Sequence, residues 1–564
     1  MALTEISVGG LDLPMIFPIL AVLFFGHQLY LQFTDPLRCI PGSRLFAITR
    51  WRLAYEDWKG TRTRKIHELH TIYGPVVRIA PTEISFNSLT ALRSIYGAGS
   101  KAQRTDFYRM FDVYGRQNLF TFGPWQMHAQ RKKMLNHAYA KSTILRGHTA
   151  QMVEGMVVKF LGLLENEKET AEEIFTSLHY FSLDTITHFL YGPKYGGTAA
   201  LTGRAQDRAL LNDILDPSRR RLSWFAVHLP RFTKWLYSRS GTIETTISTL
   251  GLLPMKKPAT YTGIRAHALQ AWRDFKNASE NEKNEYAETT IIGRLWRLHR
   301  SQKGGILEDL DIASECADHL LAGIDTTSDT LMFLIWALSL PENQKYQEEL
   351  IQEVSSIEDA QLMESGLQSA LSSDKLPYMD ALIKEALRLY APLPASEPRS
   401  FATDVVIDSF RIPKGTTVSM EPYALHRNSE VFPEPGKFNP HRWLCEGEQL
   451  NEMKKWWWAF SSGGRVCIGM QYVCLRCIHW LLYPGNGLTQ SSLAMAEMTT
   501  LLAAVYRNYR TSLKKGFEDV SPGITSRFEV FYDDRSLKME VGPYLHGYVP
   551  FRTPNNITSR SILV

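Results

Sequence analysis

The chain has 564 residues, and its 63 Lys and Arg side chains against 58 Asp and Glu leave a formal charge of +5. Hydrophobic residues make up 44% and charged residues 21%, a balance that is typical of a globular chain and excludes a disordered, collagen-like or polytopic membrane protein. So small a basic excess also argues against a dedicated nucleic-acid-binding protein.

The cysteines indicate a reducing compartment. There are six, scattered without the spacing of a secreted disulfide scaffold. Cys474 and Cys477 form a CxxC, but no second pair completes a zinc site.

The first element in chain order is an apolar N-terminal segment. The 22 residues between Asp12 and Asp35 contain no Asp, Glu, Lys or Arg, and about 20 apolar residues suffice for a membrane-spanning helix. We therefore predict a membrane anchor over residues 1–34, with a single span over about 13–33. The basic residues that follow indicate that the rest of the chain lies in the cytosol; they are Arg38, Arg44, Arg50 and Arg52.

Two alternatives to this anchor stay open. A cleaved signal peptide should begin with positive charge, whereas residues 1–12 carry Glu5 and Asp12 and no basic residue. A buried N-terminal helix is the other alternative, and Pro14 and Pro18 are compatible with it.

Beyond the anchor, helical periodicity dominates. Apolar residues recur at three- and four-residue spacing from Asp318 to Leu340 and from Met379 to Tyr390, which predicts two helices. Short β-like runs predict strands at Val76–Ile79, Ile84–Phe86, Val405–Ile407 and Thr416–Met420. No glycine-rich dinucleotide fingerprint follows any of them. We expect a mainly α fold with small β-sheets, in which residues 35–564 form a single domain.

The first of these helices contains an unfavourable cluster, Ala322-Gly323-Ile324-Asp325-Thr326-Thr327. Gly and Thr are poor helix formers, so their presence together inside a helix asks for a functional reason. Small residues at 322 and 323 would leave a groove, and Asp325 beside the Thr326 hydroxyl can relay protons into an otherwise apolar site. Taken alone, such a run would ordinarily mark a kink or a cap.

The most specific stretch runs from Phe460 to Gly469, Phe-Ser-Ser-Gly-Gly-Arg-Val-Cys-Ile-Gly. A Cys467 thiolate is a strong iron ligand that favours O–O cleavage. Glycines at 463 and 469 allow a tight turn and a close approach of backbone to a flat macrocycle. Arg465 suits a propionate of such a ring, and Phe460 can shield the sulfur from water. The alternative for an isolated cysteine is a buried, inert thiol.

This stretch resembles the haem-binding loop of the cytochrome P450 family, Phe-x-x-Gly-x-Arg-x-Cys-x-Gly, at every fixed position. The resemblance implies the fold of that family, haem b as cofactor and Cys467 as axial ligand of its iron. Residues 322–327 are likewise similar to the family's oxygen-activation motif, with dioxygen beside Ala322 and Gly323. The resemblance extends to about Asp534 and is strongest with microsomal enzymes of filamentous fungi, many of which oxidise secondary metabolites.

The resemblance also assigns a structural network. Glu385 and Arg388 lie three residues apart on one helical face, which ordinarily means a solvated ion pair. The downstream stretch Phe438–Trp443 is similar to the family segment whose arginine, here Arg442, completes a buried Glu-Arg-Arg network.

Two further places are expected at the haem edge by resemblance. Arg399 stands where family members often carry a propionate-binding arginine. His128 and a basic residue after it resemble the family's Trp/His-x-x-x-Arg helix, and Arg131 and Lys132 are both candidates for that basic residue. The alternative is an exposed basic helix face, which could equally receive an acidic electron-donor protein.

These features together predict a haem-thiolate monooxygenase held in the endoplasmic reticulum membrane by a single span, with a cytosolic catalytic domain. It would insert one atom of O2 into an apolar small molecule (a terpenoid, polyketide or alkaloid), with electrons from NADPH. A separate cytochrome P450 reductase would deliver them, with cytochrome b5 as a second candidate donor, and no nucleic acid is expected as a partner. The alternatives are a reductase-independent haem-thiolate isomerase or dehydratase, which the Asp325–Thr326 pair disfavours, and a catalytically impaired pseudoenzyme.

The pseudoenzyme alternative comes from residues 472–492. In the family the haem loop leads directly into a helix, Cys-x-Gly-x-x-Leu-Ala-x-x-Glu, whereas here 21 residues separate Gln471 from Leu493-Ala-Met-Ala-Glu497. Joining Gln471 to Leu493 restores the family pattern, so we predict that these residues come from a retained intron. A genuine loop insertion is the alternative. The tail beyond Arg535 matches no family pattern.

Overall fold

The structure, a computed structural model, describes residues 34–215, 219–237, 262–301, 307–358, 362–470 and 493–516 as its main segments. It also describes short pieces at 7–8, 11–12, 18–19, 22–26, 30, 246, 249, 524–525, 530–531 and 539–543. Helices dominate these residues and the strands are short, which confirms the predicted mainly α fold with small sheets.

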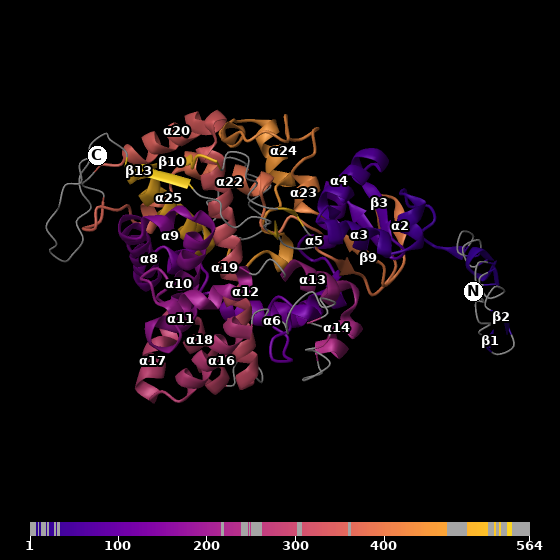
Figure 1. The fold of residues 1–564 in the computed structure, drawn as a ribbon, viewed down its shortest axis with the longest axis horizontal. Coiled ribbons are helices and arrows are strands. Elements are labelled where there is room, and N and C mark those ends of the chain that lie inside the picture. The colour runs from indigo at the N-terminus through magenta and orange to yellow at the C-terminus, as the bar shows by residue number, and fades with distance from the viewer. Residues whose placement is uncertain are drawn as a thin grey trace.

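The longest described helix, α19 (Asp309–Ser339), runs through the middle of the molecule (Figure 1). It begins well before the predicted start at Asp318, because Glu308 and Asp311 form a capping box and their carboxylates suit the positive end of the helix dipole. It ends just before Pro341, as predicted.

Helix α19 packs along α10 (Ile174–Tyr195). Gly323 permits this packing, since a Cβ there would lie 2.6 Å from Ile186 Cγ1. Gly323 therefore faces α10, while its neighbour Ala322 is exposed. A groove was expected beside both Ala322 and Gly323. In this structure Gly323 is covered by α10, so only Ala322 can line such a groove.

The other described α-helices surround this pair. Before α19 they are α2 (Arg44–Ile48), α3 (Trp51–Lys59), α4 (Arg62–Tyr73), α5 (Leu89–Tyr96), α6 (Trp125–Leu135), α7 (Lys141–Ile144), α8 (Gly147–Asn166), α9 (Lys168–Glu172), α11 (Ala205–Arg208), α12 (Asn212–Leu215), α13 (Arg219–His228), α14 (Pro230–Tyr237), α16 (Thr262–Lys276), α17 (Glu280–Thr289) and α18 (Ile291–Ser301). After it come α20 (Gln344–Ser355), α21 (Ala370–Ser373), α22 (Pro377–Leu389), α23 (Pro422–Leu425), α24 (Glu448–Trp456) and α25 (Leu493–Asn508). Short 3-10 turns are η1 (Asp106–Phe111), η2 (Ala209–Leu211), η3 (Pro341–Asn343), η5 (Pro440–Trp443) and η6 (Gly463–Arg465).

The largest sheet has five strands in the order β3-β4-β9-β6-β5. These are β3 (Val76–Ala80), β4 (Glu83–Phe86), β9 (Thr417–Ser419), β6 (Arg399–Ser400) and β5 (Gln103–Arg104). The remaining strands pair two by two: β1 (Ser7–Val8) with β2 (Leu11–Asp12), β7 (Val405–Ile407) with β8 (Phe410–Ile412), β10 (Tyr509–Leu513) with β13 (Met539–Pro543), and β11 (Ile524–Thr525) with β12 (Val530–Phe531). The four predicted strands are present as β3, β4, β7 and β9.

One large apolar core joins the helices, with side chains from α8, α10, α19, α22 and α25. A smaller cluster lies under α5 and the five-stranded sheet. Helix α25, which follows residues 472–492, is buried, and Thr327 of α19 hydrogen-bonds its Glu497. Burial raises the pKa of Glu497 to about 8.

No helix in the described ranges is both long and apolar enough to cross a membrane. Most of the predicted span over 13–33 lies outside those ranges, as do residues 472–492 and most of the tail after 535. The predictions for these segments stay predictions.

Candidate active site

Cys467 lies in a loop whose conformation requires glycine. Gly463 has a φ of 63°, and a Cβ there would lie 2.3 Å from the Tyr96 carbonyl oxygen. The Cys467 N–H donates to the Phe460 carbonyl at 3.0 Å and closes the loop. The Phe460 ring, expected to shield the sulfur, packs against Trp457 with centroids 5.8 Å apart.

The Cys467 side chain is both accessible and closely surrounded by protein. Burial raises the pKa of the thiol. The backbone N–H groups of Gly469 and Met470 oppose that rise by donating to the sulfur, as does the nearby Lys132 ammonium. A Cβ at Gly469 would lie only 3.5 Å from the sulfur. These contacts reduce the rise in pKa without reversing it, and they would stabilise the sulfur as a thiolate once it ligates a metal.

Basic side chains from separate segments converge beside this loop. They are Arg104 of β5, His128 and Lys132 of α6, Arg399 of β6 and Arg465 of η6. Burial lowers the pKa of His128 to about 2, and each of the other four adds to this shift. All five therefore share one electrostatic environment.

The positive charge of this cluster is only partly compensated, because Glu397 forms an ion pair with Arg399 at 3.1 Å while the other cations have no carboxylate partner of this kind among the described residues. Burial, together with repulsion between neighbouring cations, lowers the pKa of Lys132 to about 8, of Arg465 to about 9 and of Arg104 to about 10. Arg465 donates to the Phe122 carbonyl at 2.8 Å and Lys132 to the Val466 carbonyl at 2.7 Å. Carbonyl oxygens satisfy the N–H groups but carry no negative charge to neutralise the cations.

Two of these cations lie opposite each other in the sheet. Arg104 of β5 pairs in register with Arg399 of β6, and like charges in that position repel. Arg399 also donates to the Tyr108 hydroxyl at 2.6 Å. Among the described residues the buried Arg104 Nε finds no hydrogen-bond acceptor. Arg104 was not predicted, because it belongs to no motif and reaches the site only through the fold.

Haem b fits these residues. It carries two carboxylates on a flat ring, together with an iron that accepts a thiolate. Cys467 would ligate the iron, and the converging cations would hold the carboxylates. The Gly463 turn keeps the loop free of a side chain at its closest contact with Tyr96.

A second wall is formed by α19. Most of this helix is buried, but Asp318, Leu321, Ala322, Asp325 and Thr326 are at least partly exposed, and their spacing puts them on one side of the helix. The Thr326 hydroxyl donates to the Ala322 carbonyl at 2.7 Å. Charges on Cys467 and on Asp318 both add to the burial that raises the pKa of Tyr139, so Tyr139 lies within electrostatic range of the loop and of this helix.

A histidine that was not predicted lies next to Asp325. The buried His179 Nε2 lies 3.9 Å from Asp325 Oδ1 and 3.9 Å from Asp329 Oδ1. Its Nδ1 lies 2.6 Å from the Phe175 carbonyl oxygen and so carries a proton. His179 comes from α10, and its separation from Asp325 in sequence left no signal of this contact.

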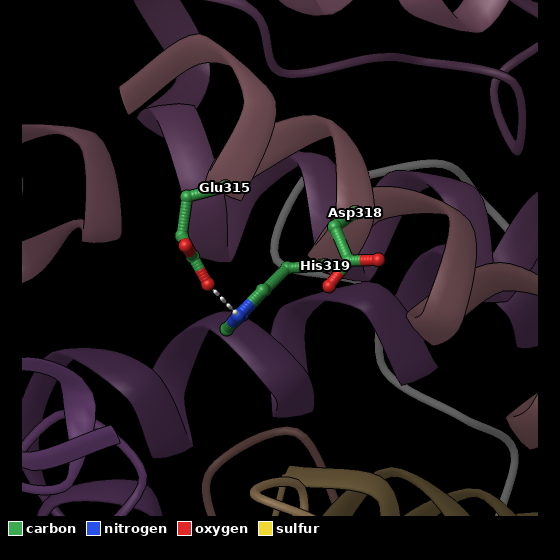
Figure 2. Close-up of side chains that lie close together, drawn as sticks. All are labelled: Glu315, Asp318 and His319. Atoms are coloured by element: carbon green, nitrogen blue, oxygen red, sulfur yellow. Dashed lines mark ion pairs between the residues drawn. The ribbon is translucent and has the colours of Figure 1, made fainter. Parts of the chain in front are cut away.

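Figure 2 shows three side chains about two to three turns before Asp325 on α19: Glu315, Asp318 and His319. Their candidate ligand atoms lie within 4.8 Å of one another. However, Glu315 already forms a buried ion pair with Arg131 and accepts the Leu119 N–H at 3.1 Å. A carboxylate that is already neutralised by a buried guanidinium favours a structural network over a metal site.

The Arg131–Glu315 ion pair decides between Arg131 and Lys132, the two candidates on α6 for the basic residue at the haem edge. Arg131 turns towards Glu315 of α19, whereas the Lys132 ammonium reaches the carbonyls of Gly464 and Val466 in the Cys467 loop. Lys132 is therefore the one placed at the loop.

The predicted Glu385, Arg388 and Arg442 network is present and buried. Arg388 forms two hydrogen bonds to Glu385, at 2.9 and 2.8 Å, and Arg442 Nε donates to the same carboxylate at 3.1 Å. The Trp443 indole N–H adds a fourth hydrogen bond at 2.9 Å. The network joins α22 to η5. It differs from the cation cluster beside Cys467 because every charge in it already has a partner.

Comparison with known proteins gives a consistent result. The family model described as Cytochrome P450 matches residues 51–472. The chain is 25% identical to Cytochrome P450 monooxygenase orf2 of Aspergillus niger, over 82% of this chain and 87% of that protein. It is 26% identical to Cytochrome P450 monooxygenase tazI of Aspergillus terreus (87% and 91%), and 27% identical to Cytochrome P450 monooxygenase stcB of Emericella nidulans (79% and 80%).

Proposed function

The chain belongs to the cytochrome P450 family and is a haem-dependent monooxygenase, and from this premise we propose that it oxidises an apolar small molecule of fungal secondary metabolism. The observation that carries the proposal is the presence of two surfaces of different chemistry, the Cys467 loop and the partly exposed side of α19. One presents the Cys467 sulfur and the cation cluster, and the other presents Ala322, Asp325 and Thr326. A substrate would bind between them.

When bound, haem supplies the centre at which O2 is reduced and from which one oxygen atom enters the substrate. Cys467 would hold the iron as a thiolate, which the N–H groups of Gly469 and Met470 would stabilise. Arg104, Arg399 and Arg465, with Lys132 and His128, hold the carboxylates and so fix the orientation of the ring.

Protons would reach this site from α19. The Thr326 hydroxyl donates to the Ala322 carbonyl, which leaves its oxygen lone pairs able to accept a proton. Asp325 precedes it, and His179 behind Asp325 can pass a proton forward from the interior of α10. This arrangement supports a monooxygenase over an isomerase or dehydratase, which needs no proton delivery.

The electrons would come from NADPH through a separate reductase, with cytochrome b5 as a second donor. Lys133, Lys454 and Lys455 are exposed, and exposed basic side chains of this kind suit an acidic donor protein. Residues 1–34 would hold the chain in the endoplasmic reticulum membrane, with the catalytic domain in the cytosol. Both assignments follow from the sequence.

The test is a carbon-monoxide difference spectrum of the reduced full chain, followed by NADPH oxidation with reductase. Wild type is expected to give the spectrum of a haem-thiolate protein, and Cys467→Ala to lose it, because the soft anionic ligand is gone. Cys445→Ala, a partly buried cysteine outside the site, is the matched control and should keep the spectrum. A normal spectrum from Cys467→Ala would contradict the assignment.

The same spectrum tests the alternative that residues 472–492 make this chain a catalytically impaired pseudoenzyme. A chain without residues 472–492 is measured in parallel with the full chain. A spectrum only from the shortened chain would support the retained-intron prediction, and a spectrum from neither would exclude the proposed function.

A further inference from the structure

Glu397 is a carboxylate that lies between the two parts of the haem site, the Cys467 loop and the cation cluster. It stands two residues before Arg399 of β6, and its side chain is 22% exposed. Its Oε2 accepts the Ser461 hydroxyl at 3.0 Å and Arg399 Nη2 at 3.1 Å. A single oxygen atom therefore joins the loop that carries the iron ligand to a cation that suits a haem carboxylate.

On the loop side, this hydrogen bond holds a turn in a conformation that needs support. Ser461 has a φ of 60°, in the left-handed region that non-glycine residues seldom adopt. The next residue is held as well, because Ser462 Oγ donates to the Tyr96 carbonyl at 3.2 Å and accepts the Trp458 indole N–H at 3.1 Å. The Ser461–Glu397 contact thus fixes the start of the loop against β6.

On the cation side, Glu397 orients a buried guanidinium. The Arg399 side chain is 2% exposed; its Nη1 donates to the Tyr108 hydroxyl at 2.6 Å and its Nη2 to Glu397. A buried guanidinium is stable only with a counter-charge and with its N–H groups satisfied. Glu397 supplies both from within the chain, so Arg399 has a defined orientation before any haem carboxylate reaches it.

The backbone at Glu397 is fixed too. The Tyr96 hydroxyl donates to the Glu397 carbonyl and accepts the Met420 N–H at 3.1 Å. The Arg399 guanidinium carbon lies 5.2 Å from the centroid of the Tyr96 ring. Because Tyr96 contacts Glu397, Arg399 and, through its carbonyl, Ser462, the two sides of the Glu397 contact share one rigid support.

We propose that Glu397 is a positioning residue for haem, which keeps the Cys467 loop and the Arg399 guanidinium at a fixed separation so that the iron and one carboxylate of the ring are held together. The inference rests on the proposed function only in taking haem as the bound group. Glu397 also brings a negative charge within electrostatic range of the Cys467 sulfur. A negative charge near the iron favours the ferric over the ferrous state.

The first test is a double-mutant cycle on the transfer of haem from the haem-loaded full chain to apomyoglobin. Ser461→Ala keeps a side chain at the same φ but loses one hydrogen bond, so transfer should be about 3- to 5-fold faster. Glu397→Ala loses both contacts and should transfer haem about 10-fold faster or more. Because both variants break the same contact, the double variant should exceed Glu397→Ala by no more than about 2-fold.

The second test separates the charge of Glu397 from its shape. Glu397→Gln keeps an oxygen that can accept from Ser461 and Arg399, so it should fold and retain haem better than Glu397→Ala. At a fixed applied potential, its ratio of ferrous to ferric haem should be about 3- to 10-fold above wild type, because a nearby negative charge is gone. Glu434→Gln, at an exposed carboxylate paired with Lys437, is the matched control and should change neither measurement.

Three outcomes overturn the proposal: Glu397→Ala transfers haem at the wild-type rate, the effects of Glu397→Ala and Ser461→Ala multiply in the double variant, or Glu397→Gln leaves the ratio of ferrous to ferric haem unchanged. Failure of the proposed function looks different. A chain that shows the expected coupling and ratio but forms no NADPH-dependent product would exclude the monooxygenase assignment and leave the role of Glu397 standing.

Discussion

Arg104 and Arg399 show how a single residue pair can reveal the chemistry of a missing partner. They lie opposite each other on neighbouring strands, both against the Tyr108 ring, with guanidinium carbons 4.8 and 5.3 Å from its centroid. Glu397 forms an ion pair with Arg399 at 3.1 Å, whereas no carboxylate among the described residues forms one with Arg104. A second buried guanidinium in this register is unfavourable unless a ligand brings an anion to it. The two carboxylates of haem meet that requirement.

Replacing Arg104 should therefore weaken haem binding. For Arg104→Gln we expect haem to transfer to apomyoglobin about 10-fold faster or more, because one charge-assisted hydrogen bond to a carboxylate is lost. Arg109→Gln is the matched control, since its side chain is 61% exposed and contacts Asp112 outside the site. Equal transfer rates from Arg104→Gln and wild type would remove Arg104 from the haem contacts.

Thr326 belongs to proton delivery and not to haem binding. Thr326→Ala should keep both haem content and the carbon-monoxide spectrum, while productive turnover falls by about 100-fold. NADPH oxidation should fall much less, with the electrons recovered as hydrogen peroxide or water. The measurement is product formed per NADPH consumed, and an unchanged ratio would show that Thr326 plays no part.

Sequence reasoning reached the residues that share a short segment and missed those that the fold brings in. Phe460, Gly463, Arg465 and Cys467 are close in the chain, so one short motif that resembles the family's haem-binding loop identified all four. Arg104 reaches the site through strand pairing with a residue almost 300 positions later, and His179 through the packing of α10 on α19. No local pattern encodes either contact.

At the scale of elements, the contact between α22 and η5 depends on one carboxylate. Glu385 accepts hydrogen bonds from two arginines, the Trp443 indole and the Asn439 N–H. Arg388 in turn reaches the carbonyls of His426 and Pro435, at 2.9 and 2.7 Å. The loops that carry His426, Pro435 and Asn439 therefore share a single buried centre.

Neutralising this carboxylate should destabilise the fold. Glu385→Gln leaves two buried guanidinium groups without their anion, at a cost of about 3–5 kcal/mol. Glu434→Gln, which breaks an exposed pair with Lys437, should cost at most about 1 kcal/mol. Urea unfolding followed by circular dichroism compares the two, and equal midpoints would contradict the structural role of the network.

The elements themselves were partly predictable. The apolar periodicity of α19 becomes regular only near Asp318, while residues 309–317 contain acidic groups that look like a loop. Those groups act at a helix start, where carboxylates are favourable. Pro341 after α19 and Pro392 after α22 indicated the helix ends more reliably, because proline cannot continue a helix.

At the scale of the whole molecule, one surface is unusually apolar. On α3 and the facing α13, Trp51, Tyr55, Trp58, Trp224 and Phe225 line a shallow apolar hollow. Trp51, Tyr55 and Trp58 are 46%, 55% and 45% exposed. Exposed aromatic groups of this kind promote association in water.

Removing the N-terminal segment should therefore not give a fully monomeric protein. A chain that begins at Asp35 keeps the Asp35–Arg78 ion pair and all the site residues, so its carbon-monoxide spectrum should be unchanged. Size-exclusion chromatography should still show self-association without detergent. Adding Trp51→Gln and Tyr55→Gln should reduce it, whereas Leu444→Gln, at an exposed position on another element, should not. A monomeric truncated chain would show that the aromatic surface is inert.

The fit between α19 and α10 also constrains how this enzyme can diverge. Any side chain at Gly323 would meet Ile186 Cγ1 and Cδ1, at 2.6 and 2.8 Å. Replacing Ile186 with alanine or glycine removes both atoms. That replacement alone leaves a cavity, which should lower the stability of the fold less than a steric clash between two long helices would. Descendants of this sequence can therefore acquire alanine at 323 only along a path in which position 186 mutates first, so the two positions should covary among its relatives.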